Sequence, residues 1–496
     1  MNKGKVILVG AGPSGIDLLT VRGLNAIKQA EIVVFDRLVS QEILELIPEN
    51  SEKIDVGKRN NHHPVPQDEI NKILVEKAKT GKNVIRLKGG DCFLFGRGGE
   101  ECEYLLQNNI DFEVVSGVTS AIAGPAYAGI PVTHRDFCSS VHIITAHARA
   151  GKKLDIDFES LVKLKGTLVF LMGLTALEQV MQGLLNAGID KNMPAAVIQN
   201  ATRPVQRKVI ADVSTISEKV RNAKIESPAL IVVGEVCKLS DSLDWLSKQP
   251  LHNKTVVVTR PKERIGTLSE KLRRLGANVI ECPCIQTVEQ VDQTKLKTAL
   301  SKKHDCVVLT SPAGVSAMVN ALKKIGKDIR ALYGCKFAVI GTGTAKELEK
   351  LGITPDFMPD VYDSANLGKL LANKLESNSS VLILRAEQGS TELTKALSDA
   401  NIHFDDMATY KTEYVCEKAD MLKNMINNNA VSAITFTSVS TVVGFVEAIK
   451  LDKYNNFTAL CIGEQTAEKA KEYGMNIKIA KKATINSMIS ALLEEE

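Results

Sequence analysis

Short apolar runs rich in β-branched residues alternate with segments of helical periodicity along the whole chain. Strands interleaved with helices build mostly parallel sheets covered by helices, so this pattern predicts an α/β fold throughout. The runs that we expect to form strands are 6–9, 32–35, 84–87, 114–115, 141–145, 167–172, 195–198, 229–233, 255–259, 306–310, 336–340, 381–384, 433–437 and 459–462.

A polar stretch at 239–254 interrupts the alternation, and it holds the only tryptophan, Trp245, and the dipeptide Gln249-Pro250. We place a linker at 247–253, because the pattern restarts after it with KTVVVTRP. A chain of 496 residues is also too long for one compact core. The sequence therefore predicts two enzymes fused in one chain.

The second half repeats one local pattern, in which an apolar strand ends in Ser, Thr or Gly and a helix begins. The repeats read VVVTRPKE, VVLTSPAGV, AVIGTGTAKEL, ITFTSVSTV and CIGEQTAEKA. Such residues cap helices, and the helix N-termini that they open also offer backbone N–H groups to anions. We expect them to line a cleft for a molecule with several carboxylates, with plain capping as the alternative.

Composition narrows the class of protein. Charged residues make up 24% and hydrophobic residues 44%, as in soluble globular proteins, and we find no bilayer-spanning stretch or signal-peptide layout. A net charge of +4 is too small to indicate nucleic acid binding. The ten cysteines include no C-x-x-C pair, and Cys282 and Cys284 lack a second pair that would complete a zinc site. We therefore expect reduced thiols, a cytoplasmic location and no metal.

The first strand opens a glycine fingerprint. Gly10, Gly12 and Gly15 follow the spacing G-x-G-x-x-G, and Asp36 ends the next apolar run about 20 residues later. This pattern predicts a flavin or nicotinamide oxidoreductase, here fused to a two-lobed module that binds small anions. A different interpretation follows from the helical stretch 24–29, which begins only after Gly23 and so indicates a long ligand-binding loop. A non-catalytic sensor of a small polyanion is a third possibility.

Three downstream motifs favour the loop interpretation. They are DVGKR at 55–59, RLKGGDCFLFGRGGEE at 86–101 and VVSGVTSAIAGPAYAGIPVTHRD at 114–136. With these motifs, residues 4–246 resemble uroporphyrinogen-III C-methyltransferase, of the tetrapyrrole methylase family. The resemblance implies a domain at 1–246 with two α/β subdomains, about 1–115 and 116–246. These would enclose S-adenosyl-L-methionine, and two chains would form a homodimer.

The resemblance also implies roles for single residues. Asp36 matches the family's proposed proton acceptor and Lys58 its proton donor, although Asp36 could instead cap a turn and Lys58 pair with a substrate carboxylate. Two departures are Ser14-Gly15 in place of the usual Gly-Asp, and Ala146 in the family's T-G-H motif. The implied cofactor residues are Pro13, Gly89, Gly90, Asp91, Leu94, Thr119, Ser120, Met172 and Ala201.

The family's substrate carries eight carboxylates, which need positive or hydrogen-bonding partners. Candidate partners are Arg59, Arg97, Arg135, His62, His63 and His147. The pair His62-His63 lies in a polar stretch, so a solvated loop is an equally good interpretation. A metal site is not expected there, because no acidic or thiol partner is suitably spaced.

Residues 254–488 resemble uroporphyrinogen-III synthase, through VVVTRP, VLTSPAGV, FAVIGTGTA, LILRAEQG, ATYKT and CIGEQTAE. The resemblance implies a domain at 254–496 with a bilobed α/β fold. One lobe would be 254–288 with 412–496, and the other 289–411. Tyr410 matches a tyrosine suggested to assist departure of the substrate's hydroxyl, although a half-buried structural tyrosine is the alternative. Substrate carboxylates would be bound by Ser311, Thr344, Ser438 and Thr466, on strand-end loops, and by Arg260 and Arg385.

Together the two resemblances imply a bifunctional enzyme of tetrapyrrole biosynthesis. Its second half would close hydroxymethylbilane to uroporphyrinogen III with inversion of the last ring. Its first half would methylate that product twice to precorrin-2. Neither resemblance distinguishes the sirohaem from the cobalamin branch, and we expect small tetrapyrroles, rather than a membrane or nucleic acid, as partners.

Overall fold

The computed structural model describes residues 4–57, 65–146 and 154–494. It divides into two compact units, Met1–Lys254 with Arg273–Asn278, and Thr255–Leu272 with Val279–Glu496. None of the described helices is long and apolar enough to cross a bilayer. All ten cysteines lie in the described part and are free thiols.

The first unit begins with a parallel five-stranded sheet of order β3-β2-β4-β1-β5. Leu8 and Val34 pack against α3 and α4 on one face, and Val9 and Val33 pack toward α1 and α2 on the other. Burial on both faces explains why these strands read as continuous apolar runs. The elements are β1 (Val6–Gly10), η1 (Ile16–Leu18), α1 (Val21–Lys28), β2 (Ile32–Phe35), α2 (Gln41–Leu44), β3 (Glu52–Asp55), α3 (Gln67–Lys79), β4 (Val84–Lys88), α4 (Gly98–Gln107) and β5 (Phe112–Val115).

The first long helix begins earlier than the sequence predicted. Helix α1 begins at Val21, because the Thr20 side chain accepts a hydrogen bond from the Gly23 N–H and caps the helix there. Gly23 is buried inside the helix, where a Cβ atom would lie 3.2 Å from Val9 Cγ1. The predicted long loop is present, since residues 11–20 separate β1 from α1 and contain only the short η1 turn.

The second sheet of the first unit has the order β6-β7-β10-β8-β9. The prediction of mostly parallel pairing is wrong here, because only β6 and β7 are parallel. Strands β8 and β9 are joined by the short loop 200–206, without the crossover helix that parallel strands need. The elements are α5 (Ser120–Tyr127), β6 (Val141–Thr145), α6 (Phe158–Lys163), β7 (Thr167–Leu171), η2 (Leu174–Ala176), α7 (Leu177–Asn186), β8 (Pro194–Gln199), β9 (Arg207–Asp212), α8 (Ile216–Asn222), β10 (Ala229–Val233) and η3 (Glu235–Leu239).

The second unit contains two further five-stranded sheets, of order β12-β11-β18-β19-β20 and β13-β17-β16-β14-β15. The elements of the first of these sheets are β11 (Thr255–Val258), α9 (Lys262–Arg274), β12 (Asn278–Glu281), α15 (Ala419–Asn427), β18 (Ala433–Phe436), α16 (Val439–Ile449), β19 (Thr458–Cys461), α17 (Glu464–Glu472), β20 (Asn476–Ile479) and α18 (Ile485–Leu493). Those of the other sheet are β13 (Ile285–Glu289), α10 (Gln293–Ala299), β14 (Cys306–Leu309), α11 (Pro312–Lys324), η4 (Ile329–Leu332), β15 (Lys336–Val339), α12 (Thr342–Glu349), α13 (Ser364–Lys374), β16 (Ser380–Ala386), α14 (Glu392–Asp399) and β17 (His403–Tyr414).

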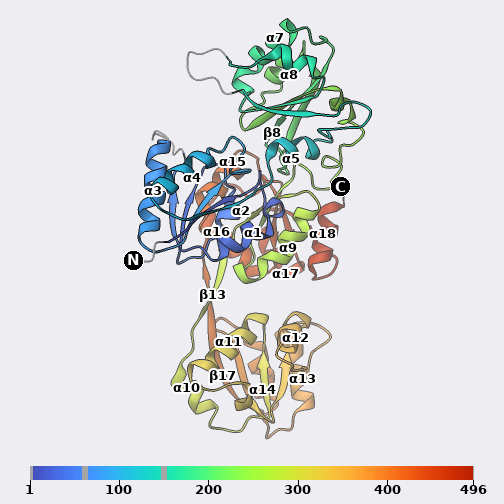
Figure 1. Ribbon diagram of the computed structural model, residues 1–496. Coiled ribbons are helices and arrows are strands. Elements are labelled where there is room, and N and C mark those ends of the chain that lie inside the picture. The colour runs from blue at the N-terminus through green and yellow to red at the C-terminus, as the bar shows by residue number, and fades with distance from the viewer. Residues whose placement is uncertain (1–3, 58–64, 147–153, 495–496) are drawn as a thin grey trace. The chain divides into compact units, whose positions relative to one another are not determined.

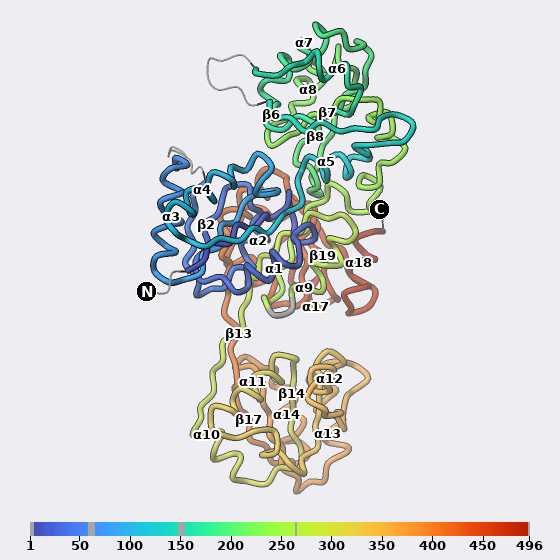
Figure 2. The backbone as a smooth tube through the Cα atoms, viewed as in Figure 1, coloured from blue at the N-terminus to red at the C-terminus, as the bar shows by residue number. Residues whose placement is uncertain are grey.

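Two strands carry the chain into and out of the second of these sheets. β13 and β17 pair antiparallel, with Ile285 opposite Tyr414 and Glu289 opposite Tyr410, and they run side by side in both backbone views (Figures 1 and 2). The five strand-end repeats each lead into a helix, as predicted. Three of them follow β11, β18 and β19 in one sheet, and two follow β14 and β15 in the other.

Main-chain contacts join the loops that follow β1, β4 and β5. Gly12 and Gly90 exchange backbone hydrogen bonds of 3.1 and 2.8 Å. A Cβ atom on Gly117 would lie 2.2 Å from the Gly90 carbonyl oxygen and 2.7 Å from Gly10 Cα. Only glycine allows this approach, so these glycines bring protein backbones together.

We expect Gly117→Ala to destabilise the first unit by about 1–3 kcal/mol, because the added methyl group meets fixed backbone atoms. Urea unfolding followed by fluorescence measures this, since the single tryptophan, Trp245, lies in the first unit. Gly99→Ala is the matched control, because its Cβ would meet nothing within 4 Å. Equal stability of the two variants would contradict the close-approach argument.

Candidate active sites

A cavity of about 580 Å³ lies in the first unit, at the carboxyl ends of β1, β2, β4, β7 and β8. Ligands of open α/β sheets bind at this end of the strands. All the cofactor residues implied by the resemblance line this one cavity: Pro13, Gly89, Gly90, Asp91, Leu94, Thr119, Ser120, Met172 and Ala201. Residues that are far apart in the sequence are therefore brought together.

The cavity wall contains unusual backbone conformations. Phe95, Arg97, Met172 and Asn200 line it with φ values of +52°, +59°, +55° and +49°. Side-chain-bearing residues rarely adopt this left-handed region, which costs free energy and is concentrated at functional sites. The surrounding fold therefore holds the wall in shape against local preference, as expected for a ligand site.

The Asp91 side chain organises the cavity loops by accepting hydrogen bonds from backbone N–H groups. One carboxylate oxygen accepts hydrogen bonds from the Phe93 and Leu94 N–H groups at 2.8 and 3.2 Å. The other accepts from the Gly117 N–H at 3.0 Å. Asp91, which the resemblance implies as a cofactor residue, thus also fixes two loops of the cavity wall.

The two departures from the family pattern also have structural roles. The Thr202 hydroxyl donates to Ser14 Oγ at 2.7 Å, which joins the loop after β1 to the loop after β8. Ala146 is buried beside Gly173, where a Cβ on that glycine would lie 3.0 Å from the Ala146 methyl group. Ser14 therefore joins two loops that line the cavity, and Ala146 packs beside Gly173, next to the lining residue Met172.

Asp36 lies on the cavity wall at the end of a chain of buried charges. It accepts a 2.8 Å hydrogen bond from Arg86 Nη2, and Arg86 Nε donates to Glu101 Oε1 at 3.1 Å. Lys88 Nζ shares that Glu101 oxygen at 2.8 Å. Burial opposes the charge of Arg86, but attraction from Asp36 and Glu101 outweighs it and raises the pKa of the guanidinium.

Sequence reasoning missed this network. The side chains of Arg86 and Glu101 are 1% and 0% exposed, and Arg86 Nη1 and Glu101 Oε2 find no hydrogen-bond partner among the described residues. A signal was present, since VIRLK places two cations in an otherwise apolar strand. Buried charges need a partner, so the strand itself indicated a buried carboxylate.

The strand order does not fit the dinucleotide fingerprint. That fingerprint needs the glycine strand and the acidic strand to be neighbours, but β4 lies between β1 and β2. Asp36 is thus roughly 10 Å from the glycine strand, two inter-strand spacings away. The Gly12 N–H donates to Gly90, and the helix begins only at Val21, so the features of a pyrophosphate site are missing.

The basic residues of the first half that we expected to bind the substrate lie in different environments. Arg97 lines the cavity and pairs with Glu100, with Nε 3.0 Å from Oε1. Arg135 is exposed and is not among the lining residues, so its contact with substrate stays a prediction. Lys88 and Arg203 line the cavity and were not predicted. Lys58, Arg59, His62, His63 and His147 lie outside the described residues.

In the second unit, the structure brings Tyr410 and Ser311 together. The Tyr410 hydroxyl lies 2.7 Å from Ser311 Oγ, and Tyr410 is 6% exposed. Ser311 also caps α11, since its oxygen accepts a hydrogen bond from the Gly314 N–H at 3.0 Å. The Ser311 hydroxyl thus both caps the N-terminus of α11 and positions the tyrosine.

Most of the other predicted synthase residues are buried in the first turn of a helix or hydrogen-bonded within the fold. Thr344 and Thr466 do not lie on loops, because α12 and α17 begin at Thr342 and Glu464 and bury them in the first turn. Ser438 caps α16 by accepting from the Thr441 N–H. Arg260 is half-buried after β11.

Arg385 is also committed within the protein. Its Nε and Nη2 atoms donate to the two carboxylate oxygens of Asp406 at 2.9 and 2.5 Å. A bidentate pair of this kind leaves little of the guanidinium for a substrate carboxylate. Capping and internal pairing thus account for Ser311, Ser438 and Arg385, three of the six polar residues that we assigned to substrate binding in this half.

The folds and cavity define an α/β methylase-type unit followed by a two-sheeted α/β unit. Residues 5–217 match the family of tetrapyrrole (corrin/porphyrin) methylases, and residues 266–490 match uroporphyrinogen-III synthase HemD. A porphyrin biosynthesis protein HemD of Ruminiclostridium josui is 49% identical over 496 residues, covering 100% of this chain and 98% of the relative. The chain belongs to this family of porphyrin biosynthesis proteins, with a methylase region followed by a synthase region.

Two partial similarities concern half of the chain. A siroheme synthase of Salmonella typhi is 48% identical over 246 residues, which are 50% of this chain and 53% of that protein. The crystal structure of a uroporphyrin-III C-methyl transferase of Thermus thermophilus, complexed with S-adenyl homocysteine, is 36% identical. It covers 47% of this chain and 99% of its own, with a TM-score of 0.42.

We expect Glu101→Gln to destabilise the first unit by about 3–5 kcal/mol, because it leaves the buried cations Arg86 and Lys88 without their shared carboxylate. Unfolding in urea, followed by Trp245 fluorescence, measures the loss. The neighbouring Glu100→Gln is the control, since the Glu100 side chain is 53% exposed and its ion pair contributes less than about 1 kcal/mol. Similar losses in both variants would argue against a structural role for the buried network.

Proposed function

We propose that this chain catalyses two consecutive steps of tetrapyrrole biosynthesis. The synthase half closes hydroxymethylbilane to uroporphyrinogen III with inversion of the last ring. The methylase half then transfers two methyl groups from S-adenosyl-L-methionine to give precorrin-2. The observation that carries the proposal is the convergence of the nine implied cofactor positions on one cavity, in a chain similar over its full length to a porphyrin biosynthesis protein.

The cavity suits S-adenosyl-L-methionine and part of a polycarboxylate. Its volume of about 580 Å³ is that of a small-molecule site. Gly89 and Gly90 let the main chain approach the ligand, and Leu94 and Met172 supply apolar wall. When bound, the cofactor supplies an electrophilic methyl group on a sulfonium.

Cations on the same wall favour an anionic second substrate. Arg86, Lys88, Arg97 and Arg203 all line the cavity. Arg97 and Arg203 are the better candidates for substrate carboxylates, because Arg86 and Lys88 are buried in ion pairs with Asp36 and Glu101. Arg97 is also paired, with Glu100, but both of those side chains are 53% exposed.

Asp36 is the proposed proton acceptor of the methylase half. Methylation of a pyrrole carbon leaves a cation, and a proton must then leave the macrocycle. The Asp36 side chain is 31% exposed at the cavity wall, and the hydrogen bond from Arg86 fixes one of its oxygens. A fixed and partly exposed carboxylate on the cavity wall supports this role. Lys58, the implied proton donor, lies outside the described residues.

Tyr410 is the proposed catalytic residue of the synthase half. Its hydroxyl can hydrogen-bond the departing hydroxyl of hydroxymethylbilane, and Ser311 orients it from 2.7 Å. Loss of water leaves a stabilised carbocation, and the shape of the site then selects the carbon that attacks. The step therefore depends on placement, and we expect no single indispensable side chain.

The resemblance and the free thiols support two further proposals, a cytoplasmic location and a homodimer formed through the methylase half. Sedimentation of the full chain tests the dimer, and a purely monomeric species would contradict it.

The decisive assay supplies hydroxymethylbilane and S-adenosyl-L-methionine to the purified chain. We expect the inverted-ring isomer when the methyl donor is omitted, and a dimethylated product when it is present, both identified by chromatography and mass spectrometry. The unmethylated ring-closed product alone would contradict the methylase proposal. A bound flavin or nicotinamide would favour the oxidoreductase alternative.

Two substitutions should separate the activities. Asp91→Ala removes three backbone anchors of the cavity loops, so we expect loss of S-adenosyl-L-methionine binding, measured by calorimetry, with ring closure intact. Tyr410→Phe should slow ring closure roughly 100-fold, as for a positioned proton donor, and leave methylation of uroporphyrinogen III unchanged. Each variant is the control for the other, and loss of both activities in either one would contradict independent sites.

A further inference from the structure

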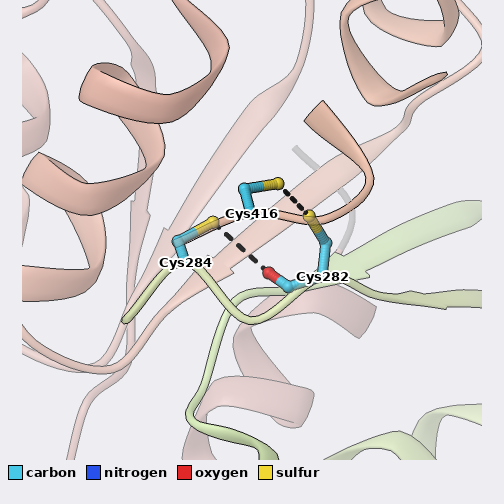
Figure 3. Close-up of side chains that lie close together, drawn as sticks. All are labelled: Cys282, Cys284 and Cys416. Carbon is cyan, nitrogen blue, oxygen red and sulfur yellow. Dashed lines mark hydrogen bonds between the residues drawn. The ribbon is translucent and has the colours of Figure 1, made fainter. Parts of the chain in front are cut away.

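Three cysteines converge where the paired strands β13 and β17 meet the sheet of β12 (Figure 3). Cys282 follows β12, Cys284 precedes β13, and Cys416 comes shortly after β17, 134 residues along the chain from Cys282. Their sulfur atoms all lie within 4.8 Å of one another, and those of Cys282 and Cys416 are 2.8 Å apart. A third thiol, that of Cys416, thus joins the Cys-Pro-Cys pair from a distant part of the sequence.

The backbone around the three thiols is already anchored. The Cys282 N–H donates to the Val258 carbonyl at 3.0 Å, and the Cys284 N–H donates to Thr259 at 3.2 Å. The Val415 N–H donates to the Cys284 carbonyl at 3.2 Å, which joins the third thiol's segment to the other two. The cluster is therefore pre-organised by the sheet.

The three thiols differ in their exposure. Cys282 and Cys284 are buried, whereas Cys416 is partly exposed and offers a path to solvent.

We propose that Cys282, Cys284 and Cys416 bind one thiophilic divalent metal ion of the zinc type. Thiolate ligands select such ions, and three sulfurs with Zn–S bonds of about 2.3 Å lie roughly 3.8 Å apart in a tetrahedral site. Small side-chain rotations reach that geometry from the observed spacing. The thiols release their protons to solvent on binding, and a water molecule completes the fourth position.

The number of thiols favours a metal over a disulfide. A disulfide joins two sulfurs at about 2.05 Å and requires an electron acceptor, and it would leave Cys284 without a role. All three sulfurs are used in a metal site, and no change of oxidation state is needed. This proposal departs from our expectation from sequence that the chain holds no metal.

The test uses the full chain, reduced, freed of metal by chelation and kept anaerobic. Co²⁺ is the probe, because thiolate coordination gives it intense near-ultraviolet absorption, and Zn²⁺ is then added in competition. We expect one equivalent of Co²⁺ per chain, displaced by Zn²⁺. Cys416→Ser should weaken binding about 100-fold or more, since even changes outside the ligand shell cost roughly 10–100-fold.

Cys335→Ser is the matched control, because Cys335 is also a half-buried free thiol of the second unit, outside the cluster. We expect it to bind Co²⁺ as the unchanged chain does. Binding that persists in Cys416→Ser, or no binding by the unchanged chain, would overturn the proposal. A Cys282–Cys416 disulfide found by mass spectrometry after exposure to air, without metal binding by the reduced chain, would assign the cluster to redox chemistry instead. None of these results depends on either enzymatic activity.

Discussion

Direct backbone contact among the loops after β1, β4 and β5 is the constraint on which the first half of this protein depends. Gly10, Gly90 and Gly117 lie so close that a single methyl group on Gly117 would overlap a neighbouring carbonyl oxygen. This contact places Asp91 so that its carboxylate can hold both the loop after β4 and the turn before α5. A pattern of glycines that resembles a phosphate-binding loop thus allows close backbone contact between neighbouring loops of the protein.

The buried charges of β4 follow from the same arrangement. Arg86 and Lys88 lie in the central strand of the sheet, where desolvation makes a cation costly unless it is paired. Glu101 supplies the pairing from α4, and Arg86 donates through Nη2 to Asp36. A well-packed apolar side chain would stabilise such a strand equally well, so the network is best explained by the position that it gives to the Asp36 carboxylate.

The sequence predicted the strands that are buried on both faces, because their apolar runs are continuous. It did not predict β17, whose residues HFDDMATYKTEY are mostly half-buried or exposed and include several charges. The antiparallel pairing of β8 with β9 was missed because periodicity reports burial and not direction. The cofactor positions were implied by the family resemblance, which rests on motifs that can be recognised in a single sequence. Glu101 and Cys416 required tertiary structure, since each meets its partners only after distant segments pack together.

The second half uses small polar residues differently from the first. Ser311 and Ser438 satisfy helix N-termini, and Ser311 in addition orients Tyr410, so capping and site-building are compatible in one hydroxyl. Tyr410 lies on β17, the strand that leads to Cys416, and β13 pairs with it continuously from Glu289 to Ile285. The cysteine cluster and the tyrosine are therefore separated by one stretch of hydrogen-bonded ladder, roughly 20 Å long for six residues of extended chain. A metal ion bound by Cys284, just before β13, and Cys416, just after β17, would restrain the paired strands that carry Tyr410.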